Sequence, residues 1–388
     1  MADAALPLAG TRVIEIGHSV AAPYAALVLA ELGAEVIKVE RPGTGDDARG
    51  WGPPFVGDTA AIFHALNRLK RSVTLDLKNP ADITKLKHLS RLSDVVIQNL
   101  KPGLAERLGI GPEALAAENP RLVYASIHAF GREGPLKDRP GYDPLMQAFG
   151  GLMSVTGHPG AEPARIGPSI IDMGTGMWVA FAVMTALMRR AETGKGGVVD
   201  TSLFETALGW MTYFVTMWSA SGKVPGKMGS GTLMIVPYQA FPTKDGYLLI
   251  GGANDALFAR LSDALGHPEW AEDPRFRTNA DRVAHREEIV GLITAETRRL
   301  TTEELGAKLD AVGVPNAPVH DTAQAAEHPQ TAALGILREN PATGLRFFGL
   351  PFSLDGTRPG PATATAAPEL GRDNPWLDAL LDDAEHDG

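Results

Sequence analysis

The sequence contains no cysteine among its 388 residues. This absence excludes disulfide bonds, thiolate zinc sites and a cysteine nucleophile. The 10 histidines are scattered and none forms an HExxH pair, so we expect no metal site. Basic residues are also in the minority, with 36 Lys and Arg against 46 Asp and Glu. A net charge of −10 offers no global positive field for a nucleic acid, so an anionic ligand has to be bound by a local site.

Long apolar runs are scarce as well. The start, "MADAALPLAG", has no basic segment followed by a cleavable apolar one. The apolar stretch at residues 20–32 is interrupted by Glu31 and is too short to span a bilayer. We therefore predict a soluble, cytoplasmic protein that binds neither membranes nor nucleic acids. At this length and 44% hydrophobic content, the chain can hold two or three globular domains.

Strand and helix patterns alternate through the first part of the chain. "TRVIEIG" is typical of a strand, "PYAALVLAELG" of a helix ended by Gly33, and "AEVIKVE" of a second strand. The alternation continues through "SVTLDL", a helix at residues 80–92, "DVVIQNL" and "RLVYASIHAF". This pattern predicts an α/β protein with a Rossmann-like parallel sheet covered by helices. The first turn, "GHSVAAP", lacks the GxGxxG glycines typical of a dinucleotide site.

The second half of the chain changes character. We expect a helix from Gly174 to about Arg190 and a second buried helix over "SLFETALGWMTYFVTMWSA". "PYQAFPTKDGYLLIGG" predicts a hairpin, and Thr301 and Glu304 have capping-box spacing. These patterns predict a large domain in residues 1–220, a smaller α+β domain in residues 221–320, and a return to the large domain with an extended tail in residues 321–388.

One carboxylate stands out in "PSIIDMGTGMW". Asp172 lies between a short β-branched run and a Gly-Thr-Gly segment that we interpret as a turn before a helix. An aspartate in this place can cap the helix by accepting backbone N–H bonds. It can also be a reactive carboxylate. The pattern alone leaves both interpretations open.

Seven stretches of the chain carry a resemblance to family III CoA-transferases, and the resemblance covers about residues 10–351. This family includes formyl-CoA transferase and several dicarboxylate CoA-transferases. The resemblance implies a CoA thioester and a carboxylic acid as substrates, and no permanently bound cofactor. The stretches occur in the family's order: "AELGAEVIKVERPGTGDDAR", "WGPPFVG", "NRLKRSV", "NLKPGLAERLG", "PGYDPLMQAFGGLMSVTG", "IDMGTGM" and "PYQAFPTKDG".

The resemblance also assigns roles to residues. Asp172 matches the aspartate that becomes acylated, and we expect it to stay ionised at the helix N-terminus. Asp143 matches an acidic position near the reaction centre. Gly229 and Gly231 fall in a stretch, residues 226–231, that matches a mobile loop over the acyl site, so we expect them to support catalysis by loop closure. The alternative is a flexible hairpin connection.

The resemblance further implies a binding site for CoA. Three residues should line the pantetheine arm, five should surround the nucleotide, and one tyrosine should lie nearby. The residues for the pantetheine arm are Ser19, Val20 and Ala21. Those for the nucleotide are Arg41, Lys70, Asn99, Leu100 and Arg107, and the tyrosine is Tyr142.

Three positions depart from the family pattern. Val20 stands where formyl-CoA transferase has a glutamine, and Ala22 where glycine is usual, which argues against formyl or oxalyl specificity. His128 stands where a small or hydroxyl residue is usual. We leave it outside the catalytic set, since a lone histidine is more often structural.

We therefore predict a CoA-transferase that takes CoA from a short acyl-CoA, such as succinyl-CoA or another dicarboxyl-CoA, through an aspartyl anhydride and an aspartyl-CoA thioester. One alternative is a 2-methylacyl-CoA racemase, although family racemases place His-Asp where this chain has Tyr142-Asp143, and a phenol is a poor base. A second alternative is a non-catalytic CoA-binding protein. The resemblance also implies a homodimer of two interlocked chains.

Overall fold

A computed structural model describes residues 6–386, and the chain divides into two compact units. The first unit comprises Met1–Leu152, Ile166–Thr212 and Pro329–Gly388. The second comprises Met153–Arg165 and Tyr213–His328. Residues 153–165 and 213–220, which we expected in the large domain, and residues 321–328, which we expected in the C-terminal return to it, thus belong to the second unit.

The first unit is built on a sheet of six parallel strands in the order β5-β2-β1-β6-β7-β8. Adjacent residues on the central strand, such as Val13 and Ile14, are both fully buried, so the two faces of the sheet are covered. Coverage on both faces explains the consecutive apolar residues of the central strands, such as residues 95–97 of β6, whereas the edge strands β5 and β8 are more polar. The strands are β1 (Arg12–Ile16), β2 (Glu35–Glu40), β5 (Lys70–Thr74), β6 (Val95–Gln98), β7 (Val123–His128) and β8 (Gly197–Ser202).

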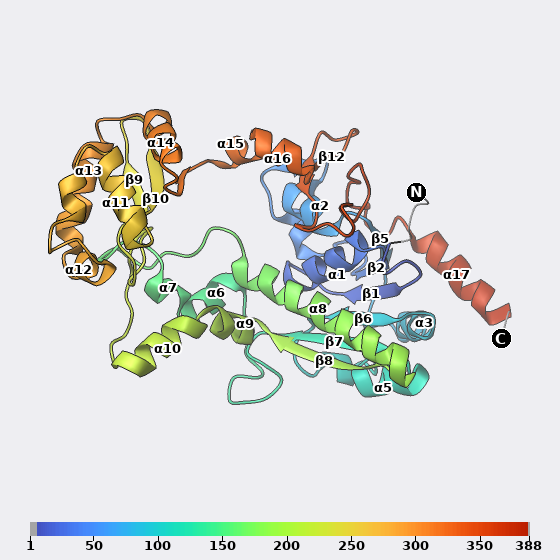
Figure 1. The fold of residues 1–388 in the computed structure, drawn as a ribbon. Helices are drawn as coiled ribbons and strands as arrows, with labels where there is room; N and C mark the ends of the chain where they lie inside the picture. The colour runs from blue at the N-terminus through green and yellow to red at the C-terminus, as the bar shows by residue number, and fades with distance from the viewer. Residues whose placement is uncertain (1–5, 387–388) are drawn as a thin grey trace. The chain divides into compact units, whose positions relative to one another are not determined.

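Helices cover the two faces of this sheet. On one face, residues such as Ile14 and Ile37 pack with leucines of α3 (Pro80–Arg91), α5 (Pro112–Glu118) and α17 (Asn374–His386). On the other face, α1 (Ala21–Glu31) and the long α8 (Ile170–Thr193) lie side by side (Figure 1). The predicted Rossmann-like α/β architecture is confirmed.

Helix α8 has the length and apolar composition of a membrane span. However, its buried residues, among them Val179 and Val183, pack toward α1 and the sheet. Core packing therefore accounts for part of its apolar character.

The segment before α17 returns to the edge of the parallel sheet. Ser72 N donates to Asp373 Oδ2 at 2.9 Å, Asp373 N donates to Ser72 O at 2.9 Å, and Thr74 N donates to Asn374 Oδ1 at 2.8 Å. These bonds occupy backbone groups of the edge strand β5 that would otherwise be unpaired. The remaining elements of the unit are η1 (Asp47–Gly50), β3 (Phe55–Val56), β4 (Thr59–Ala60), α2 (Ala61–Asn67), α4 (Leu104–Arg107), α6 (Asp143–Phe149), α9 (Leu203–Trp210), α16 (Pro329–Leu334), β12 (Leu337–Glu339) and β13 (Arg346–Phe348).

The second unit packs helices around an antiparallel sheet in the order β11-β10-β9. The predicted hairpin is confirmed, because β9 pairs antiparallel with β10. The capping box at Thr301 and Glu304 is confirmed as well. The elements of the second unit are β9 (Tyr238–Pro242), β10 (Tyr247–Gly251), α11 (Asp255–Ala264), η2 (Pro268–Ala271), α12 (Asn279–Ala284), α13 (Arg286–Thr297), α14 (Thr302–Ala311), β11 (Asn316–Pro318) and α15 (Thr322–Glu327). Helices α7 (Leu152–Val155) and α10 (Thr212–Ser221) begin at the unit boundaries.

Two helix predictions are wrong. Helix α8 begins at Ile170, so the Gly-Thr-Gly segment is helical and is not a turn. A Cβ on Gly174 would lie 2.9 Å from the Trp210 ring, and one on Gly176 would lie 2.7 Å from Ala21 O. The glycines therefore allow α9 and α1 to approach α8 closely. The single buried helix expected after residue 201 is instead α9 and α10, and α10 has no buried residue.

We predict that Gly176→Ala and Gly209→Ala have opposite effects on stability. At Gly176 the new methyl group would contact backbone atoms of α1, so we expect a loss of about 1–3 kcal/mol in the free energy of unfolding. At Gly209, inside α9, nothing lies within 4 Å of an added Cβ, and the better helix propensity of alanine should add up to about 1 kcal/mol. Urea unfolding of both variants checks the pair. Equal effects would contradict the close packing of α1 and α8.

Candidate active site

Asp172 is the third residue of α8 and its side chain is almost fully enclosed. The residue is 8% exposed, and it lies one turn before Thr175, whose hydroxyl donates to Thr206 Oγ1 at 2.7 Å. This bond joins the start of α8 to α9. Among the described residues, no hydrogen bond to the Asp172 carboxylate is found. The structure thus holds a buried carboxylate without a donor, which is costly unless function requires it.

Asp143 occupies the capping position at this helix end. Its Oδ2 accepts from Ile171 N at 2.7 Å and from Asp172 N at 3.1 Å, while its Oδ1 accepts from Gln147 Nε2 at 2.6 Å. Asp143 is 2% exposed, and Gln147 Oε1 in turn accepts from Ile166 N. Capping of α8 therefore belongs to Asp143, and the capping interpretation of Asp172 is wrong. The side chain of Asp172 remains available for chemistry.

The expectation that Asp172 stays fully ionised is also wrong. Burial, and after it the negative charge of Asp143, raises the pKa of Asp172 to about 7. Protonated and ionised forms are therefore both populated at neutral pH. In its ionised form this carboxylate lacks the solvation that makes ordinary carboxylates poor nucleophiles.

A cavity of about 460 Å³ in the first unit contains Asp172 in its wall. The carboxyl ends of the parallel strands β6 and β7 contribute to it, which is where open α/β sheets bind ligands. Seven of the predicted site residues share this wall: Ser19, Ala21, Asn99, Leu100, Arg107, Tyr142 and Asp172. The structure brings these residues together; their roles stay predictions.

The segment at residues 17–23, which comprises the loop after β1 and the first residues of α1 and which we call the cavity loop, forms part of this wall. His18 N donates to Asn99 Oδ1 at 3.1 Å, and Asn99 Nδ2 donates to His18 O at 2.9 Å. Ser19 has a φ of 70°, a left-handed conformation that is uncommon outside glycine. Burial lowers the pKa of His18, with Asp46 opposing this effect. Neutral imidazole is therefore the favoured form of this side chain at neutral pH.

Three cations line the cavity. Lys101, Arg107 and Arg139 are in the wall, and within residues 6–386 none of them has a carboxylate partner. Unpaired cations beside a cavity suit a ligand that carries phosphates or carboxylates. This is the local positive site that a chain of negative net charge requires for an anionic ligand.

Three predicted CoA-contacting residues do not line this cavity. Val20 is buried at the N-terminus of α1. Arg41 is exposed and pairs with Asp47. Lys70 is fully enclosed, and its ammonium group donates to Glu15, Asn67 and the Pro23 carbonyl at 2.7–2.8 Å. In this arrangement Lys70 has no access to a ligand, because all three of its donors are occupied inside the protein.

Several wall residues were not predicted. His18, Lys101 and Arg139 lie in the quoted motifs or directly beside them, so contiguity with "NLKPG" and "PGYD" was an available signal. His128, which we left outside the catalytic set, also lines the cavity. Its Nε2 lies 3.3 Å from Asp200 Oδ1, and Asp200 also pairs with Arg132.

The glycine-rich stretch at residues 226–231 belongs to the second unit. Gly229 has a φ of 63°, and a Cβ there would lie 2.8 Å from His158 Nδ1. Gly229 N donates to Gly157 O, Gly231 N donates to Met228 O, and Lys227 Nζ donates to Ala161 O and Glu162 O. This loop is therefore held on residues 157–162. Its part in catalysis stays a prediction.

A family model and known relatives match the chain nearly end to end. The model described as CoA-transferase family III matches residues 8–374. The chain belongs to this family. It is 36% identical to succinyl-CoA:glutarate CoA-transferase of Mus musculus, over 87% of this chain and 77% of that protein. It is 38% identical to acetyl-CoA:oxalate CoA-transferase of Acetobacter aceti, over 90% of each.

Solved structures show the same fold. A protein of Brucella suis, described as a CaiB/BaiF family protein, superposes with a TM-score of 0.88 at 38% identity, covering 97% of this chain and all of that one. The predicted family and enzyme class are thus confirmed: this family III CoA-transferase acts on CoA thioesters. No group of three or more His, Asp or Glu in the described residues is arranged to hold a metal ion.

We predict that Asp172→Asn stabilises the protein more at pH 8 than at pH 5. Because the pKa of Asp172 is raised to about 7, the ionised side chain destabilises the fold, and this penalty grows as pH rises toward 7. At about 1.4 kcal/mol per pH unit, the advantage of the variant should increase by about 2–3 kcal/mol between these pH values. Unfolding measured at both values checks this. Asp58→Asn, at an exposed carboxylate, is the control. A pH-independent difference for Asp172→Asn would contradict the raised pKa.

Proposed function

We propose that this enzyme transfers CoA from succinyl-CoA, or another short dicarboxyl-CoA, to a dicarboxylic acid, with Asp172 as the covalent carrier. The observation that carries the proposal is the buried, donor-free carboxylate of Asp172 in the wall of a cavity that also holds three unpaired cations. The names of relatives support the acid class, since they include succinyl-CoA:glutarate and succinate–glutarate CoA-transferases.

The reaction proceeds through two covalent intermediates. A carboxylate oxygen of Asp172 attacks the thioester carbonyl, the carbon–sulfur bond breaks, and CoA leaves as a thiolate while a mixed anhydride forms. The thiolate then attacks the aspartyl carbonyl of the anhydride, which gives an aspartyl-CoA thioester and releases the donor acid as its carboxylate. The acceptor carboxylate repeats these two steps in reverse order, so Asp172 is regenerated. No net proton transfer is needed.

The start of α1 supplies donors for the charge that develops on the attacked carbonyl oxygen. Ala21 is a buried residue, and no hydrogen-bond partner of its backbone N–H is found among the described residues. Ala21 also lines the cavity with Asp172. Preorganised N–H groups at a helix N-terminus stabilise an oxyanion without reorganisation. We assign the backbone N–H of Ala21 this role, in addition to the packing of Ala21 along the pantetheine arm.

The cations of the wall hold the anionic parts of the substrates. Arg107, with Asn99 and Leu100, contacts the nucleotide end of CoA, and Lys101 and Arg139 provide further charge for phosphates or for the distal carboxylate of a diacid. Arg139 is preferred for the carboxylate, because guanidinium binds it in two-point fashion. Tyr142, 54% exposed beside the cavity, packs against the bound thioester.

We predict that Asp172→Asn abolishes CoA transfer while leaving CoA bound. An asparagine keeps the shape of the side chain but cannot form the anhydride, so transfer should fall by several orders of magnitude. Trapping gives an independent readout: wild type incubated with donor acyl-CoA and then hydroxylamine should be modified at Asp172 only, as peptide mass spectrometry can show. Near-normal exchange by the variant would exclude Asp172 as the carrier.

The identity of the acids is tested by a screen of acyl-CoA donors against acceptor acids. We expect succinyl-CoA with glutarate or another short dicarboxylate to give the highest kcat/KM, and oxalate and formate to give less. If no pair exchanged CoA while a 2-methylacyl-CoA epimerised, the racemase alternative would replace this proposal. Binding of CoA without either reaction would favour the non-catalytic alternative.

We also propose that the enzyme works as a homodimer in the cytoplasm. One face of α8 exposes large apolar side chains, with Met177, Phe181 and Met188 each more than half exposed. A second copy of the chain would bury them. The interlocked arrangement comes from the family resemblance.

We predict that wild type at micromolar concentration has twice the mass of one chain in light scattering. Phe181→Asp should weaken the dimer, because it places a charge within the apolar face of α8. Ile62→Asp, at an exposed apolar residue of α2, is the matched control and should leave the mass unchanged. A wild-type mass equal to that of one chain would exclude the dimer.

A further inference from the structure

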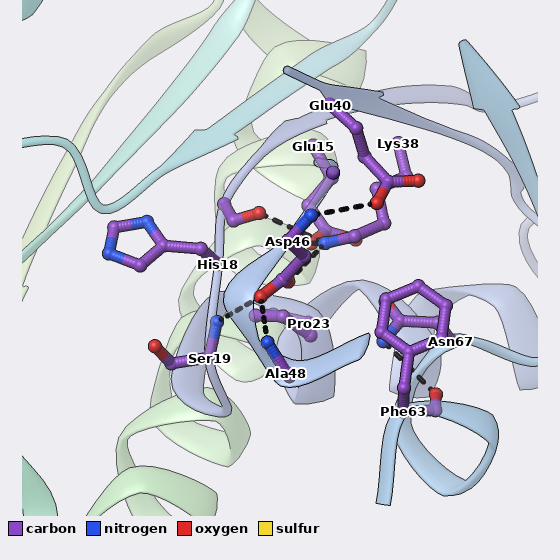
Figure 2. A network of polar contacts seen from close by, with 12 residues as sticks. Glu15, His18, Ser19, Pro23, Lys38, Glu40, Asp46, Ala48, Phe63 and Asn67 are labelled. Carbon is purple, nitrogen blue, oxygen red and sulfur yellow. Dashed lines mark hydrogen bonds and ion pairs between the residues drawn. The ribbon is translucent and has the colours of Figure 1, made fainter. Parts of the chain in front are cut away.

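A group of four buried charged side chains lies behind the cavity loop. Glu15, Lys38 and Lys70 have fully enclosed side chains, and that of Asp46 is 1% exposed. Lys38 Nζ lies 2.7 Å from Glu15 Oε1 and 2.9 Å from Asp46 Oδ2, and Lys70 Nζ lies 2.7 Å from Glu15 Oε2. Figure 2 shows this network, with the ring of His18 pointing away from it. Burying so many charges is costly, so they should serve a purpose beyond stability.

Three side chains of the network form hydrogen bonds with the backbone of the cavity loop. Lys38 Nζ donates to Gly17 O at 2.9 Å, Lys70 Nζ donates to Pro23 O at 2.8 Å, and Ser19 N donates to Asp46 Oδ1 at 3.0 Å. The loop is thus held at its beginning, middle and end by side chains from β2, β5 and the segment before η1. These bonds supply the restraint that the left-handed backbone of Ser19 needs in order to persist.

The bonds made by Lys38 and Asp46 persist over a wide pH range, whereas burial outweighs the charge of Glu15 at Lys70 and lowers the pKa of Lys70 to about 8. Burial lowers the pKa of Lys38, but Glu15, Asp46 and Glu40 outweigh this effect and the net shift is upward. Burial raises the pKa of Asp46, but Lys38 and the N–H groups of Ala48 and Ser19 lower it further than burial raises it. Asp46 is therefore an ionised acceptor for Ser19 N, and Lys38 an ionised donor to Gly17 O.

We propose that the network of Glu15, Lys38, Asp46 and Lys70 positions the cavity loop, and thereby sets the affinity for CoA thioesters. None of the four side chains touches the ligand. They act through the loop, whose residues Ser19 and Ala21 line the cavity. Lys70, which resemblance assigned to the nucleotide of CoA, is on this argument a positioning residue. The inference rests on the proposed role of the loop in CoA binding.

The test compares Asp46→Ala with Arg338→Met. Asp46→Ala removes the bond to Ser19 N and one of the two ion-pair partners of Lys38. Arg338→Met likewise removes one of two partners of a buried charge, Glu31, at the opposite end of α1. Both variants should lose stability. If Asp46→Ala does not fold, the double variant Lys38→Met with Asp46→Ala replaces it. The double variant removes one positive and one negative charge, so the remaining cation Lys70 keeps its ion pair with Glu15.

Two readouts separate positioning from stability. By calorimetry, we expect the Kd for CoA to rise about 10- to 100-fold in the Asp46 variant and to stay within about 2-fold of wild type in Arg338→Met. By hydrogen exchange, peptides that cover residues 17–23 should exchange faster only in the Asp46 variant. Unchanged exchange of the loop, or faster exchange with unchanged CoA affinity, would overturn the inference. A wild-type protein that failed to bind CoA would instead count against the proposed function of the cavity.

Discussion

The carboxylate of Asp143 is the group on which the geometry and the electrostatics of the candidate site both depend. By accepting the N–H groups of Ile171 and Asp172, it fixes the first turn of α8 and with it the backbone of the proposed nucleophile. A cap of this kind contributes about 1 kcal/mol to a helix. The same negative charge raises the pKa of Asp172, after the larger effect of burial. The Asp143 side chain thus fixes the backbone of the site and also disfavours the ionised form of Asp172.

Reactivity and stability oppose each other at Asp172. A carboxylate with water and donors around it is stable and unreactive, while a buried one without donors is costly and more nucleophilic. The first unit offsets this cost through packing around the start of α8. Gly176 lets the backbone of α1 approach, and the hydroxyl of Thr175 joins α8 to α9. The apolar core between the sheet and helices α3, α5 and α17 then stabilises the first unit and offsets the cost of the site.

Much of the fold could be predicted from local patterns, because a parallel strand buried on both faces is a short apolar run between turn residues. β1 and β2 are of this kind. The role of the Gly-Thr-Gly segment could not be predicted, since the reason for glycine at position 176 is the carbonyl of Ala21, which is remote in sequence. Whether the apolar residues of α10 are buried was equally out of reach, because the pattern does not reveal what covers a helix.

The candidate site shows the same division. Asp172 and six of its cavity neighbours came from resemblance in ordered motifs, whereas spacing left helix capping and catalysis open. Lys70 was misplaced because a lysine in a basic motif looks like a free cation, and its partner Glu15 lies 55 residues away. The resemblance predicted that the acidic residue Asp143 lies near the reaction centre. That Asp143 caps a helix 28 residues later could not be predicted, because this is a tertiary contact. Resemblance predicted the residues, and the packing shows which of them line the cavity.

The connectivity of the first unit has a consequence for how the chain matures during synthesis. Leu377 and Leu381 of α17 complete the core beside Leu86 and Leu89 of α3, and Asp373 pairs with the edge strand at Ser72. The core around the first strands is therefore complete only after residues 373–381 have been synthesised. The residues from Tyr213 to His328 need no such late partner for their own sheet and core. We therefore expect the second unit to become protease-resistant on the ribosome first, while the first unit stays incomplete until residues 373–381 have been synthesised.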